Sequence, residues 1–558
     1  MKKFISVVLS VAISATAILS GCSKIETSIS ELAGDDVEPN FSFVNSFDVD
    51  TTKTGKELTS LFNNINLWNV WAPGKDESYN IFEFTDYVQL MQCSGGTETR
   101  DLFKDPLDTS VLDDYDFTKL LNACQGILDT GAKPHLKLGS VPLKYSTNAT
   151  NGTFSMNVYP PDDYDVYYKY IYALASALVE EFGKKEVLTW RFGVMTEFEN
   201  KDWFMHPSGD PEKTKDAYCK LYDYTVQALI DAIGKKVFVG AHAMACSEGM
   251  WDYSEFIKHV AEGTNYANGK KGTRICYLAS SWYHSQAGMP IYKTNLSFVE
   301  TMTNLQKAAN KYGLDDLIYG VDEGRILIGS KPGYEKFDLN TRVVGHTYQA
   351  AFDAKLYKQA MDTGVDYFSS WGFVTSGMPT MSYYIAKHTA EFEGMTRVKA
   401  VQTDTSSFNS ETKALAAYDK DTKTLRIMAY NYEETLDDVT AKPLMFNIKM
   451  PQNDGKVKIT TRYINDDCNY FDEWLEDRKT YNITDDMFKW SPDDPAISVF
   501  LDKADDQLKN TFYNEMLPKY KEAAKLTPKE STAEIKDGVL TVNDTIDGNS
   551  VVFYEIQF

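Results

Sequence analysis

Several short motifs that mark common catalytic and binding sites are missing from this sequence. It has no GxGxxG, GxxxxGK[ST] or GxSxG segment, so it does not predict dinucleotide binding, nucleotide hydrolysis or serine-esterase chemistry. It has no HExxH motif and no Cys/His cluster, and none of its cysteines are spaced CxxC. We therefore predict no metal site and no cofactor.

Positive charge is also scarce. The 558 residues contain 57 Lys and Arg against 80 Asp and Glu, which gives a formal net charge of −23. Such a chain repels phosphate backbones and anionic lipid headgroups, so nucleic acid is not an expected partner. Apolar residues make up 43% of the chain, enough for a large packed core. Aromatic residues make up 13%; most belong in that core, although such rings also line sugar-binding clefts.

The first 22 residues have the organisation of a bacterial secretion signal. Lys2 and Lys3 form a basic start, residues 4–19 are apolar and uncharged, and the segment ends in LSGC. This ending resembles a lipobox, in which Cys22 receives a diacylglyceryl group; an ordinary signal with a chance cysteine is the alternative. We expect a lipid-anchored protein of the bacterial cell envelope that faces away from the cytoplasm, with the polar residues 23–40 as a linker.

Strand-like and helix-like segments alternate from about residue 60 to 395. The eight candidate strands are Leu67–Trp71, Tyr87–Met91, His135–Leu138, Leu188–Val194, Val237–Gly240, Ile275–Ser280, Leu317–Val321 and Tyr367–Trp371. Amphipathic segments lie between them, for example Tyr164–Phe182, where apolar residues recur every three to four positions. The pattern predicts a (β/α)8 TIM barrel over residues 41–396, in an α/β fold; a doubly wound open sheet is the alternative.

After residue 397 the apolar residues alternate with polar ones, as in strands that bury one face. We expect a C-terminal antiparallel β-sandwich over residues 397–558, interrupted by a partly helical insertion at about 471–515. Residues 41–50 are also suited to pair with this sandwich. The six cysteines after residue 22 are expected to be buried thiols rather than disulfides.

Two glutamates directly follow predicted strands of the barrel. Glu197 comes after the fourth strand and Glu323 after the seventh. Active sites of TIM barrels lie at the C-terminal ends of the strands, so the two carboxyls can face each other across the mouth. One neutral and one ionised carboxyl suit glycoside hydrolysis.

Other roles for these glutamates remain open from the residues alone. Either could cap a helix or form an ion pair with Arg191 or Arg325. If the loop after the fourth strand is shifted, Glu199 rather than Glu197 is the acid.

A longer pattern runs from residue 115 to 372. Its segments are Tyr115–Phe117, GAKPHLKLGSVP (131–142), TWRFGVMTEFEN (189–200), Lys220–Tyr222, Val237–Gly240, Tyr277–His284, Val321–Gly324 and Ser370–Gly372. Their order and spacing resemble glycoside hydrolase family 39, a family of retaining enzymes that includes β-xylosidases and α-L-iduronidases. The similarity covers most of residues 60–558, and it implies a (β/α)8 barrel with a β-sandwich.

The resemblance implies a glycosidase that cleaves xyloside-like or related oligo- or polysaccharides by double displacement. Glu197 matches the general acid/base of the family and Glu323 its nucleophile. The chain departs from the family at Thr196 (Asn in the family), Phe198 (Pro), Gly324 (Trp) and Lys137 (an acidic residue). These departures concern sugar preference more than the reaction.

Side chains near the two glutamates are candidates for substrate binding. Trp282 and Trp371 are candidates for stacking on sugar rings; Gln92, Lys137, His242 and Thr196 for contacts with sugar hydroxyls; and Tyr283 and His284 for holding Glu323. Each of them has a packing role as the alternative. A catalytically inactive barrel that binds glycans at the cell surface is the alternative function, and a structural envelope protein without a cleft is a third.

Overall fold

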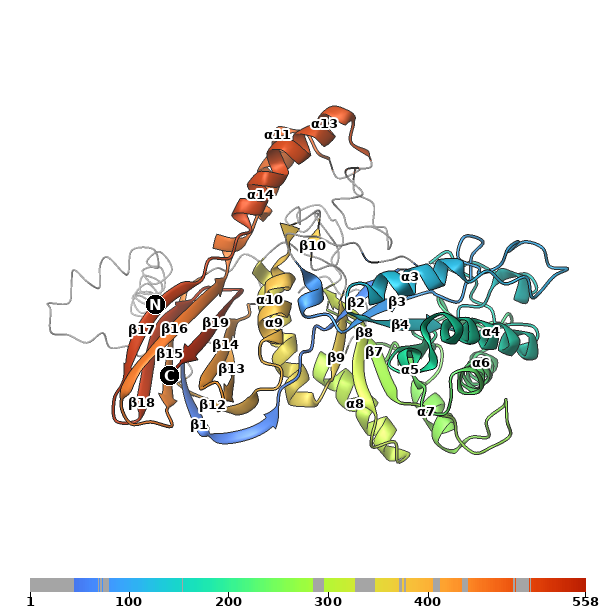
Figure 1. Cartoon of the computed structure of the whole chain (residues 1–558), viewed down its shortest axis with the longest axis horizontal. Coiled ribbons are helices and arrows are strands. Elements are labelled where there is room, and N and C mark those ends of the chain that lie inside the picture. Colours follow the sequence, from blue (N-terminus) through green and yellow to red (C-terminus); the bar gives the residue numbers. More distant parts are fainter. Residues whose placement is uncertain are drawn as a thin grey trace, which may run out of the picture. The chain divides into compact units, whose positions relative to one another are not determined.

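The computed structural model describes residues 45–68, 70, 73, 80–152, 154–284, 296–326, 347–370, 374–375, 378–404, 412–433, 440–484, 487, 501 and 503–558 (Figure 1). These residues form two compact units. The barrel unit comprises residues 58–394 and 466–526, and the sheet unit takes its described residues from 45–57, 395–465 and 527–558. Among the described helices, none combines the length and apolar character needed to cross a membrane.

Eight parallel strands close into a barrel at the centre of the barrel unit. They are β2 (Asn64–Leu67), β3 (Tyr87–Leu90), β4 (Lys133–Leu138), β5 (Arg191–Val194), β6 (Phe238–Ala243), β7 (Tyr277–His284), β8 (Ile318–Ile326) and β9 (Tyr367–Ser370). Strand β9 pairs with β2 as well as with β8, so the sheet has no edge. The predicted TIM barrel is confirmed, and the open-sheet alternative is excluded.

Helices lie around this barrel (Figure 1). They are α3 (Thr118–Leu128), α4 (Tyr164–Phe182), α5 (Lys184–Val187), α6 (Pro211–Ala232), α7 (Tyr253–Glu262), α8 (Phe298–Lys311), α9 (Thr347–Thr363) and α10 (Met381–Ala390). The bounds of α4 are those that the apolar spacing predicts. The Asp163 carboxylate caps its first turn by accepting bonds from two backbone N–H groups, and Gly183, at φ 80°, ends it.

Five predicted strands have a boundary that is wrong by three or more residues. Strands β6, β7 and β8 continue to Ala243, His284 and Ile326 instead of ending at Gly240, Ser280 and Val321, so Glu323 lies within β8. Strand β2 ends at Leu67, because Trp68 leaves the sheet to pack with Met91, Met156 and Trp203. Strand β5 begins only at Arg191, because the three preceding residues close the short helix α5 with backbone hydrogen bonds. The packing of Trp68 thus sets the end of β2, and the hydrogen bonds that close α5 set the start of β5; strand propensity sets neither.

The insertion at 466–526 groups with the barrel unit and contains α11 (Phe471–Thr480), α13 (Asp506–Thr511) and α14 (Leu517–Ala523). A short π-helix, Phe512–Met516, joins α13 to α14. Tyr470, Trp474 and Tyr520 are the largest buried side chains of a small apolar core inside the insertion. The remaining short elements of this unit are 3-10 helices Ile81–Glu83, Leu143–Tyr145 and Asp466–Cys468, and the strands β10 (Val374–Thr375) and β11 (Met378–Pro379).

The sheet unit is built from one nine-stranded, mostly antiparallel sheet. Its strands are β1 (Asn45–Glu57), β12 (Thr396–Asp404), β13 (Thr412–Asp419), β14 (Thr424–Asn431), β15 (Lys442–Lys449), β16 (Gly455–Ile464), β17 (Lys529–Ile535), β18 (Val539–Ile546) and β19 (Ser550–Gln557). The sheet order runs from β17 to β18, and these two outer strands are joined by the turn Lys536–Gly538. The sheet thus folds over one core, which confirms the predicted β-sandwich class.

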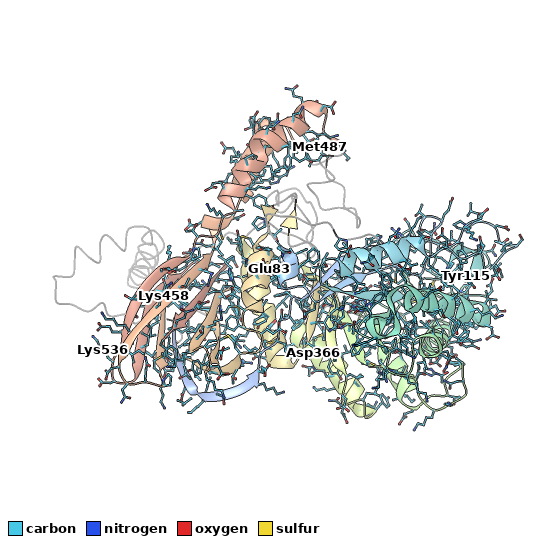
Figure 2. All side chains as sticks on the ribbon, viewed as in Figure 1. Glu83, Tyr115, Asp366, Lys458, Met487 and Lys536 are labelled. Atoms are coloured by element: carbon cyan, nitrogen blue, oxygen red, sulfur yellow. The ribbon has the colours of Figure 1, made fainter. Side chains whose placement is uncertain are left out.

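Strand β16 illustrates how the sequence produces this core. Val457 and Ile459 are buried, whereas Lys458 between them is exposed (Figure 2). The same alternation along the other strands places Phe47, Phe446 and Tyr554 in a single apolar cluster. All six described cysteines are free thiols, and five of them are buried.

Candidate active site

A tight turn at the end of β5 presents Glu197 at the mouth of the barrel. Met195 and Glu197 both have positive φ angles, 64° and 42°, which side-chain-bearing residues rarely adopt. The turn is held by backbone bonds from Met195 N–H to the Leu138 carbonyl and from Phe198 N–H to the His242 carbonyl. Each such residue costs about 1–3 kcal/mol, so the neighbouring strands must impose this geometry.

The Glu197 carboxyl is buried and its proton is held tightly. Asn200 Nδ2 donates to its Oε2 at 2.7 Å, and the side chains of Ser281 and Trp203 also hydrogen-bond to it. Burial, followed by the negative charge of Glu323, raises the pKa of Glu197 to about 7 despite these bonds. Near neutral pH the group can therefore act as an acid or as a base.

Strand β8 contains a β-bulge that presents two adjacent carboxyls to the barrel interior. Ser280 pairs with Val321 and Ser281 with Glu323, so Asp322 is the extra residue. In a regular strand Asp322 and Glu323 would point to opposite faces, but a bulge re-aims one of them. The Tyr283 hydroxyl donates to Glu323 Oε1.

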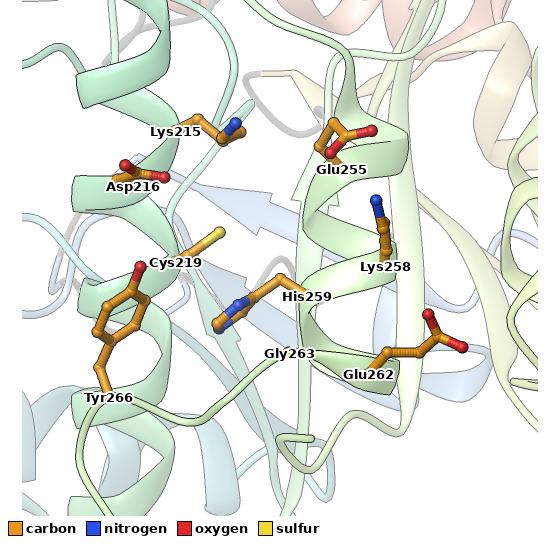
Figure 3. Close-up of a pocket in the computed structure, with 9 residues that line it drawn as sticks. All are labelled: Lys215, Asp216, Cys219, Glu255, Lys258, His259, Glu262, Gly263 and Tyr266. Carbon is orange, nitrogen blue, oxygen red and sulfur yellow. The ribbon is translucent and has the colours of Figure 1, made fainter. Parts of the chain in front are cut away.

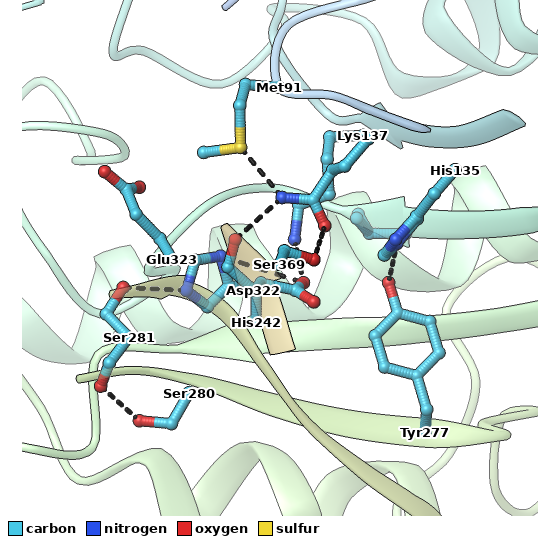
Figure 4. A network of polar contacts seen from close by, with 12 residues as sticks. Met91, His135, Lys137, His242, Tyr277, Ser280, Ser281, Asp322, Glu323 and Ser369 are labelled. Carbon is cyan, nitrogen blue, oxygen red and sulfur yellow. Dashed lines mark hydrogen bonds and ion pairs between the residues drawn. The ribbon is translucent and has the colours of Figure 1, made fainter. Parts of the chain in front are cut away.

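Below Glu323, Asp322 is the centre of a buried polar network (Figure 4). Lys137 Nζ lies 2.6 Å from its Oδ2, and the Tyr367 hydroxyl donates to its Oδ1 at 2.6 Å. The side-chain amides of Gln89 and Asn66 donate to its backbone carbonyl. Asp322 was not among the residues that the sequence singled out; the adjacent acids at the end of β8 were the available signal.

His242 connects this network to Glu197. Its Nε2 lies 2.8 Å from the Ser281 hydroxyl oxygen, and its Nδ1 lies 3.9 Å from Asp322 Oδ2. Burial, together with the positive charge of Lys137, holds the pKa of His242 well below its usual range, so the ring is neutral.

Ser281 therefore lies next to both predicted catalytic glutamates. It is the register partner of Glu323, and its hydroxyl bonds to Glu197. The sequence profile of Glycosyl hydrolases family 39 matches residues 101–376, which include Glu197, Ser281 and Glu323. The chain belongs to glycoside hydrolase family 39.

Individual proteins that are similar to this family 39 chain include characterised bacterial enzymes. The beta-xylosidase of Caldicellulosiruptor saccharolyticus is 25% identical over 265 residues, which is 46% of this chain and 49% of that one. The chain thus aligns with about half the length of this relative. The monomeric beta-xylosidase of Caulobacter crescentus CB15 (TM-score 0.63, 16% identity) and the GH39 enzyme of Xanthomonas axonopodis pv. citri (TM-score 0.63, 15% identity) share the fold. The two alignments cover 92% and 93% of this chain, respectively, and 99% of each of the two similar chains.

The predicted binding residues of this family 39 chain fall into different environments. Lys137, His242 and Tyr283 lie around the two glutamates, as described above. Gln92 is buried after β3, where its Oε1 accepts a bond from Arg100. Thr196 is buried beside Glu197. Trp371, the His284 side chain and the predicted lipidation site Cys22 lie outside the described residues.

The predicted stacking role of Trp282 needs correction. Its ring lies parallel to Phe352, with centroids 5.9 Å apart, and edge-on to Phe298. Its N–H donates to the Leu296 carbonyl at 3.0 Å. Side chains alternate along β7, so Ser281 and Tyr283 point to the interior and Trp282 packs against α8 and α9. Trp282 is a core residue in this environment.

The two arginines that were alternative partners for the glutamates have other contacts. Arg325 forms an ion pair with Asp353, with Nε and Oδ1 3.3 Å apart. Arg191 stands at the opposite end of β5 from Glu197, with its guanidinium 3.9 Å from the Tyr87 ring centroid. The ion pairs that the sequence left open are therefore not those seen in the described structure.

Glu199 lies at the same loop as Glu197 but has a different setting. Its Oε1 accepts bonds from the backbone N–H groups of Met244 and Ala245, at 2.8 and 3.2 Å. Burial raises its pKa to about 8. Its carboxyl thus fastens the loop after β6 to the loop after β5.

A separate groove of about 320 Å³ lies outside the barrel between α6 and α7 (Figure 3). It is lined by charges of both signs, including Lys215 and Glu255. His259 in its wall bonds to the buried Asp223 at 2.9 Å, which in turn accepts from Thr273 and the Tyr266 backbone. This pair serves to join α6, α7 and the following loop. Across the described ranges, no three His, Cys, Asp or Glu residues are placed to hold a metal ion.

Proposed function

We propose that this chain is a retaining glycosidase that cleaves O-glycosidic bonds of oligo- or polysaccharides by double displacement. The proposal is carried by one observation: two carboxyls share the barrel mouth, Glu197 with a pKa near 7 and Glu323, which accepts a bond from the Tyr283 hydroxyl and whose charge raises the pKa of Glu197. Two carboxyls of different protonation state are the requirement of this reaction.

In the first step, the Glu323 carboxylate attacks the anomeric carbon while Glu197 gives its proton to the departing glycosidic oxygen. A glycosyl ester on Glu323 forms and the aglycone leaves as an alcohol. In the second step, Glu197, now ionised, removes a proton from water, and the water oxygen displaces Glu323 from the anomeric carbon. Two inversions return the sugar with its original configuration.

Membership of glycoside hydrolase family 39, a family of retaining enzymes, favours retention over inversion. Retaining enzymes hold their carboxyls about 5–5.5 Å apart, whereas inverting enzymes need about 6.5–9.5 Å to admit a water between them. Here Glu323 is the register partner of the residue whose hydroxyl bonds to Glu197, and its charge is the second largest cause of the raised Glu197 pKa. Both observations support a single site for the two carboxyls, as either mechanism requires.

Xylosides are the first substrates to test, because the similar protein from Caldicellulosiruptor saccharolyticus is named a beta-xylosidase. The decisive experiment is incubation with a panel of 2-deoxy-2-fluoro glycosides, beginning with the xyloside, followed by peptide mass spectrometry. We expect a covalent adduct on Glu323 in the wild type and no adduct in Glu323→Gln. Oligosaccharide binding without any turnover or adduct would instead support the glycan-binding alternative.

We also infer that Cys22 carries a lipid anchor and that the protein works at the bacterial cell envelope, outside the cytoplasm. The support is the sequence LSGC at the end of an apolar, uncharged stretch. Metabolic labelling with an alkyne-tagged fatty acid should mark the wild type but not Cys22→Ala. Ser23→Ala is the matched control and should be labelled like the wild type; an unlabelled wild type would contradict the anchor.

A further inference from the structure

The interior of the barrel holds an unusual concentration of charge. Three carboxyl side chains, Glu197, Asp322 and Glu323, share this space with the ammonium group of Lys137, and both Lys137 and Asp322 have no exposed surface. A buried charge is expensive unless a partner compensates it. The arrangement therefore requires a reason beyond packing.

Lys137 is placed to act on two carboxylates at once. Its Nζ donates to Asp322 Oδ2 at 2.6 Å, and its charge also interacts favourably with Glu323. Gly193 on the adjacent strand makes room for the lysine stem, since a Cβ there would lie 2.7 Å from Lys137 Cδ. The barrel interior thus has room for the side chain of Lys137 beside Gly193.

Asp322 in turn fixes the backbone that carries Glu323. As the extra residue of the bulge, it determines the direction in which Glu323 leaves β8. Its carboxylate is held by Lys137 and Tyr367, and its carbonyl by Gln89 and Asn66. Four strands besides β8 therefore hold this one residue.

We propose that Lys137 and Asp322 form a positioning pair: Asp322 sets the bulge that aims Glu323, and Lys137 balances the added negative charge so that Glu323 stays ionised beside Glu197. Under the proposed glycosidase activity, on which this inference rests, neither residue touches the reacting atoms. Removing one charge disturbs Glu323, whereas removing both leaves the local net charge unchanged.

Other polar groups also face this pair and are kept constant in the test. Those from the surrounding strands are Asn66 (β2), Gln89 (β3), His135 (β4), His242 (β6), Tyr277 and Ser281 (β7), Glu323 (β8) and Tyr367 (β9), with Cys93 and Glu197 in the loops after β3 and β5.

The test compares the pH dependence of kcat/KM for three variants with that of the wild type on one active aryl glycoside. In Lys137→Met, loss of the positive charge favours the protonated form of Glu323. The acidic limb of the pH profile should therefore move up by about one unit, and kcat/KM should fall about tenfold at pH values below the limb. In Asp322→Asn, the ammonium group of Lys137 loses its partner and interacts with Glu323 instead. The acidic limb of the pH profile should therefore move to lower pH, and kcat should fall about tenfold at all pH values. The double variant, Lys137→Met with Asp322→Asn, should have its acidic limb within about 0.3 pH units of the wild-type position.

Lys133→Met is the matched control, because Lys133 lies on the same strand and forms an ion pair of equal length with the part-exposed Glu186. Lys133→Met should leave the acidic limb of the pH profile at the wild-type pH.

If a single variant fails to fold, the double variant must still fold, since a neutral pair replaces the buried ion pair. Its acidic limb must then lie at the wild-type pH. The inference would be overturned if the acidic limb of the pH profile moved in the same direction in both single variants. It would also be overturned if kcat/KM of the double variant were as low as that of either single variant. A wild type without turnover would overturn the proposed function itself, and with it this inference.

Discussion

The interiors of the two units differ in kind. Among its described residues the sheet unit buries no charged side chain, and Phe47, Phe446, Ile427, Leu540 and Ile556 are members of its apolar core. The barrel interior instead buries Lys137, His242 and Asp322 without any exposed surface. Close packing of apolar groups stabilises a fold directly, whereas buried charges stabilise it only when each has a partner.

This difference separates the part of the molecule that is built for stability from the part that is built for chemistry. The barrel interior keeps a strained turn at Met195 and Glu197 and a carboxyl whose pKa is raised to about 7. Neither feature stabilises the fold, and both prepare a site in which a proton can move near neutral pH. The sheet unit has no need of such features, so its interior follows the simple alternation of its strands.

Replacement of Glu197 should have the largest effect on activity. Glu197→Gln removes the proton donor but keeps the shape, so kcat/KM should fall by about 10²–10⁴-fold on glycosides with poor leaving groups. The loss should be much smaller with a good leaving group such as dinitrophenolate, which departs without a proton. Steady-state kinetics on both kinds of substrate measure this contrast, and an equal loss on both would show that Glu197 is not the acid.

A large-to-small change in the sheet core should have the next largest effect, and on stability instead of chemistry. The Phe446 ring stacks on Phe47, with centroids 5.5 Å apart, and is fully buried. Phe446→Ala should lower the free energy of unfolding by about 3–5 kcal/mol and leave the pH optimum unchanged.

The tryptophans allow this effect to be assigned to one unit. All nine lie within the residue ranges of the barrel unit, so their fluorescence follows the barrel, whereas far-UV circular dichroism follows both units. Urea unfolding of Phe446→Ala should show the loss in the circular dichroism signal. An unfolding curve that superimposes on that of the wild type would mean that Phe446 is not part of a tightly packed core.

The stability of the barrel should depend on pH through Glu197. Its pKa is about 7 in the folded state against an ordinary value of 4.5, so the folded state holds the proton longer than the unfolded state. The free energy of unfolding should therefore fall as pH rises from 4.5 to above 7, by up to about 3 kcal/mol. Glu197→Gln does not titrate and should be more stable than the wild type at pH 8 but not at pH 4.

The control for this measurement is Glu262→Gln on the exposed face of α7, which should follow the wild type at both pH values. Urea unfolding monitored by tryptophan fluorescence gives the four comparisons. Equal pH dependence of Glu197→Gln and wild type would place the proton elsewhere in the barrel.

Alternating strands and helices predicted the barrel, with an open sheet as the alternative, because both folds show that alternation. The same pattern placed Glu197 at the mouth, since it follows β5, whereas Glu323 lies within β8 and not after it. The bulge at Asp322 could not be predicted, because it depends on the register between β8 and the Ser280–Ser281 step of β7. Register is a property of two strands, and no local spacing records it.

A different cause explains the error at Trp282. Trp282, Tyr283 and His284 follow one another, and side chains alternate along β7. Tyr277 and Ala279 face the interior, so Ser281 and Tyr283 do too, whereas Trp282 points outward and meets Phe352.

Glu199 should show the smallest effect, and it decides which carboxyl of the loop is the acid. Its pKa of about 8 means that it is neutral at pH 6, where its Oε1 accepts two backbone bonds. The carbonyl oxygen of a glutamine can accept the same two bonds, so Glu199→Gln should change both kcat/KM and the free energy of unfolding by less than about 1 kcal/mol at pH 6. If Glu199 were instead the proton donor, the same substitution would lower kcat/KM by about 10²–10⁴-fold. Kinetics of Glu199→Gln beside Glu197→Gln, on the same substrate at pH 6, therefore separate a carboxyl that joins two loops from one that moves a proton.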